Sequence, residues 1–139
     1  MANMDMDMIK AMRGRWKGKV ILVAEDVDTS NMFYKAALSK TGADVIWTEN
    51  GKDAVEQCEE QKQIDLVLMD INMPEMNGLE ATKAIKAIRP EIPVIVQTAY
   101  LLSNEREKSF EVGADDFIAK PVTYQKLLEV MHTYLKTDD

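Results

Sequence analysis

Short apolar runs alternate with longer amphipathic stretches from residue 19 to residue 136 of the chain. The apolar runs predict five strands, at residues 19–24, 43–48, 65–70, 92–97 and 115–119. The stretches between them place apolar side chains at helical spacing and predict five helices, at residues 29–41, 51–62, 78–88, 104–112 and 123–136. Strands that alternate with helices form a parallel sheet covered on both faces. The pattern therefore predicts an α/β three-layer sandwich of five βα units and leaves the strand order open.

Residues with suitable preferences stand at the ends of the predicted helices. Asp28, Thr29 or Ser30 can cap the first helix and Thr123 can cap the last, because their side-chain oxygens accept hydrogen bonds from free backbone N–H groups. Gly113 follows the fourth helix, where a glycine readily takes the left-handed conformation that ends a helix. These residues support the predicted helices.

Five polar residues stand at or just beyond the ends of apolar runs. They are Glu25 and Asp26 after the first strand, Asp70 at the end of the third, Thr98 after the fourth and Lys120 after the fifth. The carboxyl ends of parallel strands lie at one edge of the sheet, and ligands bind in the crevice beyond that edge. We therefore expect one site that contains three carboxylates, a hydroxyl and an ammonium.

The three carboxylates indicate a cation. At an effective dielectric constant of about 20, two like charges about 4 Å apart repel by roughly 4 kcal/mol, so Glu25, Asp26 and Asp70 need a neutralising partner. Carboxylate oxygens suit a hard divalent ion such as Mg²⁺, which keeps other positions for water or phosphate. The backbone carbonyl of Asn72, in the segment that follows Asp70, can supply a further ligand.

The same residues fit phosphoryl transfer. A carboxylate such as Asp70 can act as a nucleophile and form an aspartyl phosphate. The ammonium of Lys120 and the metal would spread the charge of the transferred group, and Thr98 would donate its hydroxyl to a phosphoryl oxygen. Asp65, Asp115 and Asp116 precede strands instead, so we expect them at the opposite edge, in solvated loops.

Length and charge narrow the function further. The chain has 139 residues, which is the size of one domain, and its formal net charge of -7 argues against direct binding of nucleic acid or of an anionic membrane. The negative net charge favours cations or partners with a basic face.

The single cysteine, Cys58, excludes an internal disulfide and fits a small buried side chain. No apolar run approaches the roughly 20 residues of a membrane helix, so we expect a cytoplasmic protein.

The two ends of the chain differ from its centre. Residues 1–18 are rich in methionine and charge, and we interpret them as an extension or linker, helical over residues 6–13, with Trp16 packed against the edge of the core. Residues 19–136 form the predicted domain, and residues 137–139 form a tail. His132 lies far from every motif, which favours a surface or packing role.

Four segments carry a family resemblance. They are residues 21–26 (ILVAED), 65–78 (DLVLMDINMPEMNG), 96–99 (VQTA) and 113–122 (GADDFIAKPV). Through them the chain resembles a receiver domain of a two-component response regulator. The resemblance implies a flavodoxin-like sheet of order 2-1-3-4-5 and a phosphorelay in which Asp70 accepts the phosphoryl group. The donor would be a phosphohistidine on a sensor histidine kinase or a histidine phosphotransfer domain.

The resemblance also implies roles for individual residues. Mg²⁺ would be held by Asp26, Asp70 and the carbonyl of Asn72, with Glu25 assisting through water. Lys120 would precede a cis peptide bond to Pro121.

A surface change is also implied by the resemblance. Thr98 and Phe117 would move together on phosphorylation and change the surface of the fourth helix, fifth strand and fifth helix, a surface through which two copies could pair. Residues 15–19 (RWKGK) resemble the junction before the receiver at the end of a hybrid sensor kinase, so the chain is either such a receiver or a stand-alone regulator.

Three other functions remain open at this point. A Mg²⁺-dependent phosphohydrolase with an aspartate nucleophile would use a second acid two residues later, and that position is Asn72. An interaction module that works without phosphorylation would carry a decayed site, and this site is intact in sequence. A flavin-binding domain would have a phosphate loop rich in glycine and hydroxyl groups after the first strand, where this chain has Glu25, Asp26, Val27 and Asp28.

Overall fold

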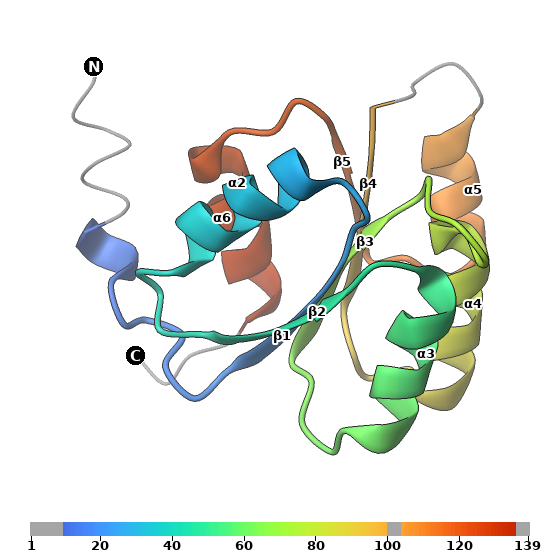
Figure 1. Ribbon diagram of the computed structural model, residues 1–139, viewed down its shortest axis with the longest axis horizontal. Helices are drawn as coiled ribbons and strands as arrows, with labels where there is room; N and C mark the ends of the chain where they lie inside the picture. The colour runs from blue at the N-terminus through green and yellow to red at the C-terminus, as the bar shows by residue number, and fades with distance from the viewer. Residues whose placement is uncertain (1–9, 100–103, 136–139) are drawn as a thin grey trace.

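A parallel sheet of five strands forms the centre of the molecule (Figure 1). The computed structural model describes residues 10–99 and 104–135. The strands are β1 (Val20–Ala24), β2 (Asp44–Thr48), β3 (Leu66–Asp70), β4 (Val94–Thr98) and β5 (Asp116–Ala119). They lie in the order β2-β1-β3-β4-β5, and every neighbouring pair is parallel. The predicted α/β sandwich and the strand order implied by the resemblance are both confirmed.

Helices cover both faces of the sheet. They are α2 (Asp28–Leu38), α3 (Gly51–Glu60), α4 (Gly78–Ile88), α5 (Glu105–Glu111) and α6 (Tyr124–Tyr134). Figure 1 shows α2 and α6 on one face and α3, α4 and α5 on the other. Alternate side chains of each strand enter two separate cores: on β1, Ile21 and Val23 pack on the side of α2 and α6, whereas Leu22 and Ala24 pack on the side of α3 and α4. This double burial explains why the inner strands are apolar up to the polar residues at their carboxyl ends.

Most element boundaries differ from the predicted ones by one to three residues, and two of these shifts have a clear physical cause. β4 begins at Val94 instead of residue 92, because Pro93 has no N–H with which to extend the ladder. α2 ends at Leu38 instead of residue 41. The carbonyl of Leu38 accepts hydrogen bonds from both the backbone N–H and the hydroxyl of Thr41, at 3.0 and 2.6 Å, which closes a turn in place of another helical bond.

The predicted cap of the last helix is confirmed, whereas the predicted cap of the first helix is wrong. α2 already begins at Asp28, with Val27 in the cap position, and the structure shows no side-chain cap there. The prediction that Asp28, Thr29 or Ser30 caps this helix is therefore wrong. Thr123 caps α6 as predicted, because its hydroxyl accepts from the N–H of Lys126 at 3.1 Å.

The acids that precede strands lie at the amino edge of the sheet, but the predicted solvated loops are wrong. Oδ2 of Asp65 accepts a hydrogen bond from the N–H of Val20, and Oδ2 of Asp115 accepts one from the N–H of Val94, each at 2.8 Å. Asp116 is the first residue of β5, and it is also half-buried and hydrogen-bonded. The first N–H of an inner strand needs an acceptor, and here the carboxylate before the neighbouring strand supplies it.

Residues 10–18 pack against the domain. Trp16 is fully buried in the core beside α2 and α6, and Met12 lies in the same cluster. The N–H groups of Gly14 and Trp16 donate to the carbonyls of Lys40 and Thr41, at 2.8 and 2.9 Å. The predicted packing of Trp16 is confirmed, and its side chain belongs to the core itself.

The remaining predictions for the ends concern residues at or beyond the described ranges. Of the helix predicted over residues 6–13, residues 10–12 are helical. Residues 1–9 and the predicted tail at residues 137–139 lie outside the described residues. Within residues 10–99 and 104–135, none of the helices combines the length and the apolar character that a membrane span requires.

Cys58 and His132 have the environments predicted for them. Cys58 is fully buried on α3, and burial, only partly offset by the charge of Arg89, raises the pKa of its thiol to about 11. A thiol with so high a pKa is a poor nucleophile at neutral pH, so the cysteine acts as a packing residue. His132 is exposed on α6.

Replacement of Trp16 tests whether residues 10–18 stabilise the domain. We expect Trp16→Ala to lower the free energy of unfolding by about 3 to 5 kcal/mol, the usual cost of deleting a fully buried aromatic side chain. Urea denaturation followed by circular dichroism measures the change. Lys17→Ala, at the exposed neighbouring position, should change the same free energy by less than about 0.5 kcal/mol. Similar losses for the two variants would contradict the packing role of Trp16.

Candidate functional site

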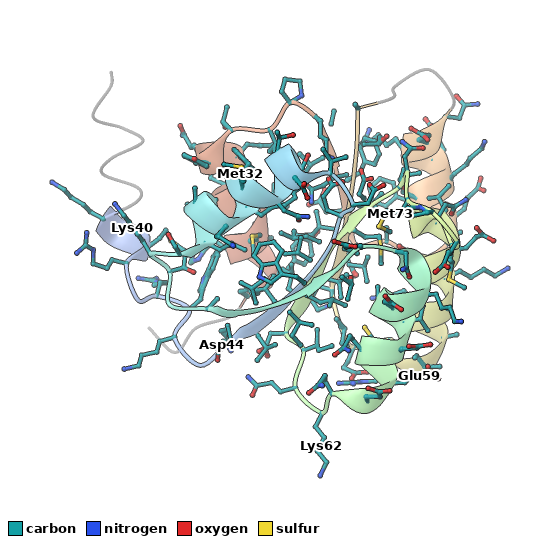
Figure 2. The ribbon with its side chains drawn as sticks, viewed as in Figure 1. Met32, Lys40, Asp44, Glu59, Lys62 and Met73 are labelled. Carbon is teal, nitrogen blue, oxygen red and sulfur yellow. The ribbon has the colours of Figure 1, made fainter. Side chains whose placement is uncertain are left out.

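The polar residues predicted at the strand ends lie at one edge of the sheet. Glu25 and Asp26 follow β1, Asp70 is the last residue of β3, Thr98 is the last residue of β4, and Lys120 follows β5. All strands run in the same direction, so their carboxyl ends meet at this edge. Figure 2 shows Asp44 and Lys62 at the opposite end of the sheet from Met73, which lies in the loop after β3.

The ammonium of Lys120 joins two of the acids. Its Nζ lies 2.6 Å from Oε1 of Glu25 and 3.2 Å from Oδ1 of Asp70. The side chain of Glu25 is 1% exposed and that of Asp70 is 8% exposed. Buried carboxylates are costly unless they are paired and hydrogen-bonded. Lys120 supplies that pairing from a strand end 95 residues away from Glu25 in sequence.

The site does not fully balance its negative charge. Burial, together with the charge of Glu25, raises the pKa of Asp70 to about 6, although Lys120 acts in the opposite direction. Burial opposes the charge of Lys120 as well, but its hydrogen bond to Glu25 and the charges of both acids keep its pKa above the usual value. Lys120 is therefore a fixed cation at neutral pH, and the surplus charge is negative.

The acids also fit a metal ion. Glu25, Asp26 and Asp70 each offer a carboxylate oxygen, and these three oxygens lie within 4.8 Å of one another. Asp26 is exposed, so the cluster opens to solvent. An all-oxygen donor set with an open side fits Mg²⁺. The side chain of Asn72 is also exposed beside this cluster, and its carbonyl as a ligand stays a prediction.

The loop after β3 holds Asp70 at the edge. The N–H of Gly78 donates to the carbonyl of Ile71 at 2.8 Å. A Cβ atom at Gly78 would collide with the backbone carbonyl of Asp70, so this close approach requires glycine. Asn77 and Glu80 then form a reciprocal capping box at the start of α4. On the other side of the site, the Lys120–Pro121 peptide bond is cis, as predicted.

Thr98 is fully buried and its hydroxyl is engaged. Oγ1 of Thr98 donates to Oε1 of Glu105 at 3.1 Å and accepts from Nδ2 of Asn72 at 3.4 Å. Glu105 was not among the site residues predicted from the sequence. It is one of two acids in the first turn of α5, with Glu107, and no feature of the sequence distinguishes them.

Phe117 lies on the same face of the sheet as Thr98. Val96 pairs with Phe117 and Thr98 pairs with Ala119 in the register of β4 and β5. Phe117 is half-buried and packs against the core on the side of α3 and α4. The predicted pair of Thr98 and Phe117 is thus placed on neighbouring strands, and their joint movement stays a prediction.

A buried polar pair lies on the opposite face and was also missed. The hydroxyl of Tyr34 donates to Oε1 of Gln97 at 2.6 Å, and both side chains are 1% exposed. Burial and the charges of Glu25 and Asp70 raise the pKa of Tyr34 above its usual value, so its hydroxyl keeps its proton. Gln97 within an otherwise apolar strand was the signal in the sequence, because a buried amide needs a partner.

Comparison with known proteins decides the family. The model of the response regulator receiver domain matches residues 21–132. The chain belongs to the response regulator receiver family. The receiver domain is 37% identical over 120 residues to the chemotaxis protein CheY of Thermotoga maritima. That alignment covers 86% of this chain and 99% of CheY. It is 38% identical over 123 residues to hybrid signal transduction histidine kinase I of Dictyostelium discoideum.

The coverage of these relatives differs. The match spans 83% of the receiver domain chain but only 7% of the Dictyostelium kinase. Among solved structures, the receiver domain of a sensor histidine kinase from Pseudomonas aeruginosa, which has a magnesium ion coordinated in its active-site cleft, aligns with a TM-score of 0.78 and 30% identity. That alignment covers 86% of this chain and 98% of the other. The receiver fold therefore occurs in short proteins and within long kinases.

The raised pKa of Asp70 predicts how stability depends on pH. A carboxyl with a pKa of about 6 in the fold, against about 3.9 when unfolded, keeps a proton that the unfolded chain has lost between these values. Its contribution to stability is therefore present below about pH 4 and is lost as the pH rises through about 6. In metal-free buffer we expect Asp70→Asn to raise the free energy of unfolding by about 2 to 3 kcal/mol at about pH 8, and we expect no gain at about pH 4.

Urea denaturation of both proteins with a chelator present measures this difference. Asp44→Asn, at an exposed acid on β2, is the matched control and should change stability by less than about 0.5 kcal/mol at either pH. A gain for Asp70→Asn that is the same at both pH values would contradict the shifted pKa.

Proposed function

We propose that this receiver domain is a phosphoacceptor in a two-component phosphorelay and that Asp70 receives the phosphoryl group. The observation that carries the proposal is the ion-paired cluster at the sheet edge. Lys120 contacts both Glu25 and Asp70, and three carboxylates offer oxygens within 4.8 Å of one another. The donor would be a phosphohistidine of a sensor histidine kinase or of a histidine phosphotransfer domain.

Transfer of the phosphoryl group follows from these positions. An oxygen of the Asp70 carboxylate attacks the phosphorus atom of the phosphohistidine, a P–O bond forms and the P–N bond breaks. The imidazole keeps the electron pair of that bond and takes up a proton from water. Lys120, which lies 3.2 Å from Oδ1 of Asp70, neutralises charge on the phosphoryl oxygens.

The acidic cluster would hold the divalent ion that such chemistry uses. Asp26, Asp70 and the carbonyl of Asn72 would bind Mg²⁺ directly, and Glu25 would assist through water. The ion would shield the negative charge of the incoming phosphoryl group from the carboxylates. Support comes from the spacing of the carboxylates and from the raised pKa of Asp70, which indicates surplus negative charge.

The phosphoryl group would change a surface. Thr98 would donate its hydroxyl to a phosphoryl oxygen and Phe117 would change its packing. The affected surface is that of α5, β5 and α6. A ligand shifts a two-state equilibrium only by its difference in affinity for the two states, and a change from 1:99 to 99:1 needs about 5.5 kcal/mol. The same surface would serve for pairing of two copies of the domain.

The phosphorelay role places the domain in the cytoplasm, either alone or as part of a hybrid kinase. The relatives include a polar-differentiation response regulator, DivK of Brucella anthropi, of which the match covers 96%, and the long Dictyostelium kinase. Receiver domains are signalling domains.

The phosphohydrolase alternative is not favoured, because Asn72 stands where a second acid would be needed.

Phosphate uptake with a small donor tests the role of Asp70. We expect the wild-type domain to take up about one phosphoryl group per chain from acetyl phosphate with Mg²⁺, and we expect Asp70→Asn to lose this uptake, because an amide oxygen is a poor nucleophile. Mass spectrometry of the intact protein measures the gain in mass.

Asp65→Asn is the matched control, since Asp65 precedes the same strand at the opposite edge. It should keep the uptake. Undiminished uptake in Asp70→Asn would contradict the assignment of Asp70 as the phosphoacceptor. Steady release of phosphate far beyond one equivalent per chain would support the phosphohydrolase instead.

Mg²⁺ should stabilise the domain, because it binds the folded cluster and not the unfolded chain. At a Mg²⁺ concentration roughly ten times the dissociation constant, the gain is about 1.4 kcal/mol, seen as a higher melting temperature. Asp26→Ala should stabilise the metal-free domain, since it removes one of the crowded charges, and should abolish the effect of Mg²⁺. Asp44→Ala should keep that effect. An unchanged melting temperature in millimolar Mg²⁺ would count against the proposed metal site.

A further inference from the structure

The single proton of the Thr98 hydroxyl is already used. The hydroxyl of Thr98 donates to the carboxylate of Glu105 at 3.1 Å and accepts from the side chain of Asn72 at 3.4 Å. A hydroxyl has one proton and can make only one strong donation at a time. The bond that a phosphoryl group on Asp70 would require from Thr98 therefore competes with the bond to Glu105.

Glu105 is also tied to its helix. It lies in the first turn of α5, and its backbone carbonyl accepts a hydrogen bond from the hydroxyl of Ser109 at 2.6 Å. Ser109 is fully buried and lies in the same helix, so its bond stabilises the first turn of α5, and the side chain of Glu105 connects that turn to Thr98. A change at the Thr98 hydroxyl would therefore act directly on the first turn of α5.

Electrostatic repulsion would also weaken the bond between Thr98 and Glu105 once Asp70 carries a phosphoryl group. Glu105 is half-buried and Thr98 is fully buried, so the contact lies in a region where charges are only partly screened. A phosphoryl group that carries up to two negative charges and bonds to Thr98 would come close to the carboxylate of Glu105. Repulsion would then favour displacement of the carboxylate.

We propose that Glu105 is a positioning residue of this site: its carboxylate holds the Thr98 hydroxyl and the start of α5 in the unphosphorylated arrangement, and a phosphoryl group on Asp70 displaces it. This inference rests on the proposed phosphoacceptor function and adds to it a residue that opposes activation. Breaking the Thr98–Glu105 bond is a cost of activation, so loss of Glu105 makes activation easier.

The test uses fluoroberyllate with Mg²⁺, which mimics the phosphoryl group, and measures its affinity by NMR titration of the whole domain. We expect Glu105→Ala to bind fluoroberyllate about tenfold more tightly than the wild type, the effect of losing one hydrogen bond to a charged acceptor. Glu105→Gln should fall between the two, because a neutral acceptor forms a weaker bond. Glu107→Ala, which removes the other acid of the same turn, should bind like the wild type.

Two further measurements separate a positioning role from a general effect on folding. In a Thr98→Val background, Glu105→Ala should no longer change the affinity, because the bond is already absent. Without fluoroberyllate, the α5 amide shifts of Glu105→Ala should move toward those of the bound wild type.

The outcomes are distinct. Equal affinities of Glu105→Ala and Glu107→Ala, or a gain that persists with Thr98→Val, would overturn the role of Glu105 while leaving the phosphoacceptor function intact. Failure of the wild type to bind fluoroberyllate, or unchanged binding by Asp70→Asn, would instead overturn the proposed function itself.

Discussion

One ammonium between two buried carboxylates is the interaction on which the site depends. Glu25 and Asp70 lie at the ends of neighbouring strands and are almost fully withdrawn from solvent, and Lys120 reaches both of them from beyond β5. Removal of the ammonium would leave two buried like charges, which is far more costly than loss of an exposed ion pair. Even with it, the pKa of Asp70 remains raised. The site therefore stays short of positive charge, which suits the capture of a metal ion beside a phosphoryl group.

The two edges of the sheet use acids in different ways. At the carboxyl edge the acids crowd together and leave oxygens for a ligand. At the amino edge, Asp65 and Asp115 each accept the first N–H of a neighbouring strand, and Asp115 also pairs with Lys86 at 2.8 Å. Both carboxylates therefore accept hydrogen bonds from backbone groups of the fold. The same residue type is thus a structural group at one edge and part of a crowded carboxylate cluster at the other, because only the carboxyl edge brings three carboxylates within 4.8 Å of one another.

Polar contacts lead away from the site on both faces of the sheet. On one face Gln97 accepts from Tyr34 of α2, and on the other Thr98 donates to Glu105 of α5. Neighbouring residues of a strand point to opposite faces, so two consecutive positions of β4 connect the site to two different helices. The Gln97 contact is fully buried and pairs the Tyr34 hydroxyl with Oε1 of Gln97. The Thr98 contact is made through the one hydroxyl that a phosphoryl group would also need.

Much of this protein could be predicted from its sequence, because periodicity and strand direction are local properties. The alternation of apolar runs and amphipathic stretches determined the five βα units, and the parallel direction of the strands placed Glu25, Asp70 and Lys120 at one edge. Tertiary structure alone decided which partners meet: Trp16 within the core, Glu105 and not Glu107 on Thr98, and Asp65 and Asp115 as acceptors for strand N–H groups. These contacts join residues that no short-range pattern relates. They depend on register, helix orientation and burial, which exist only once the chain is folded.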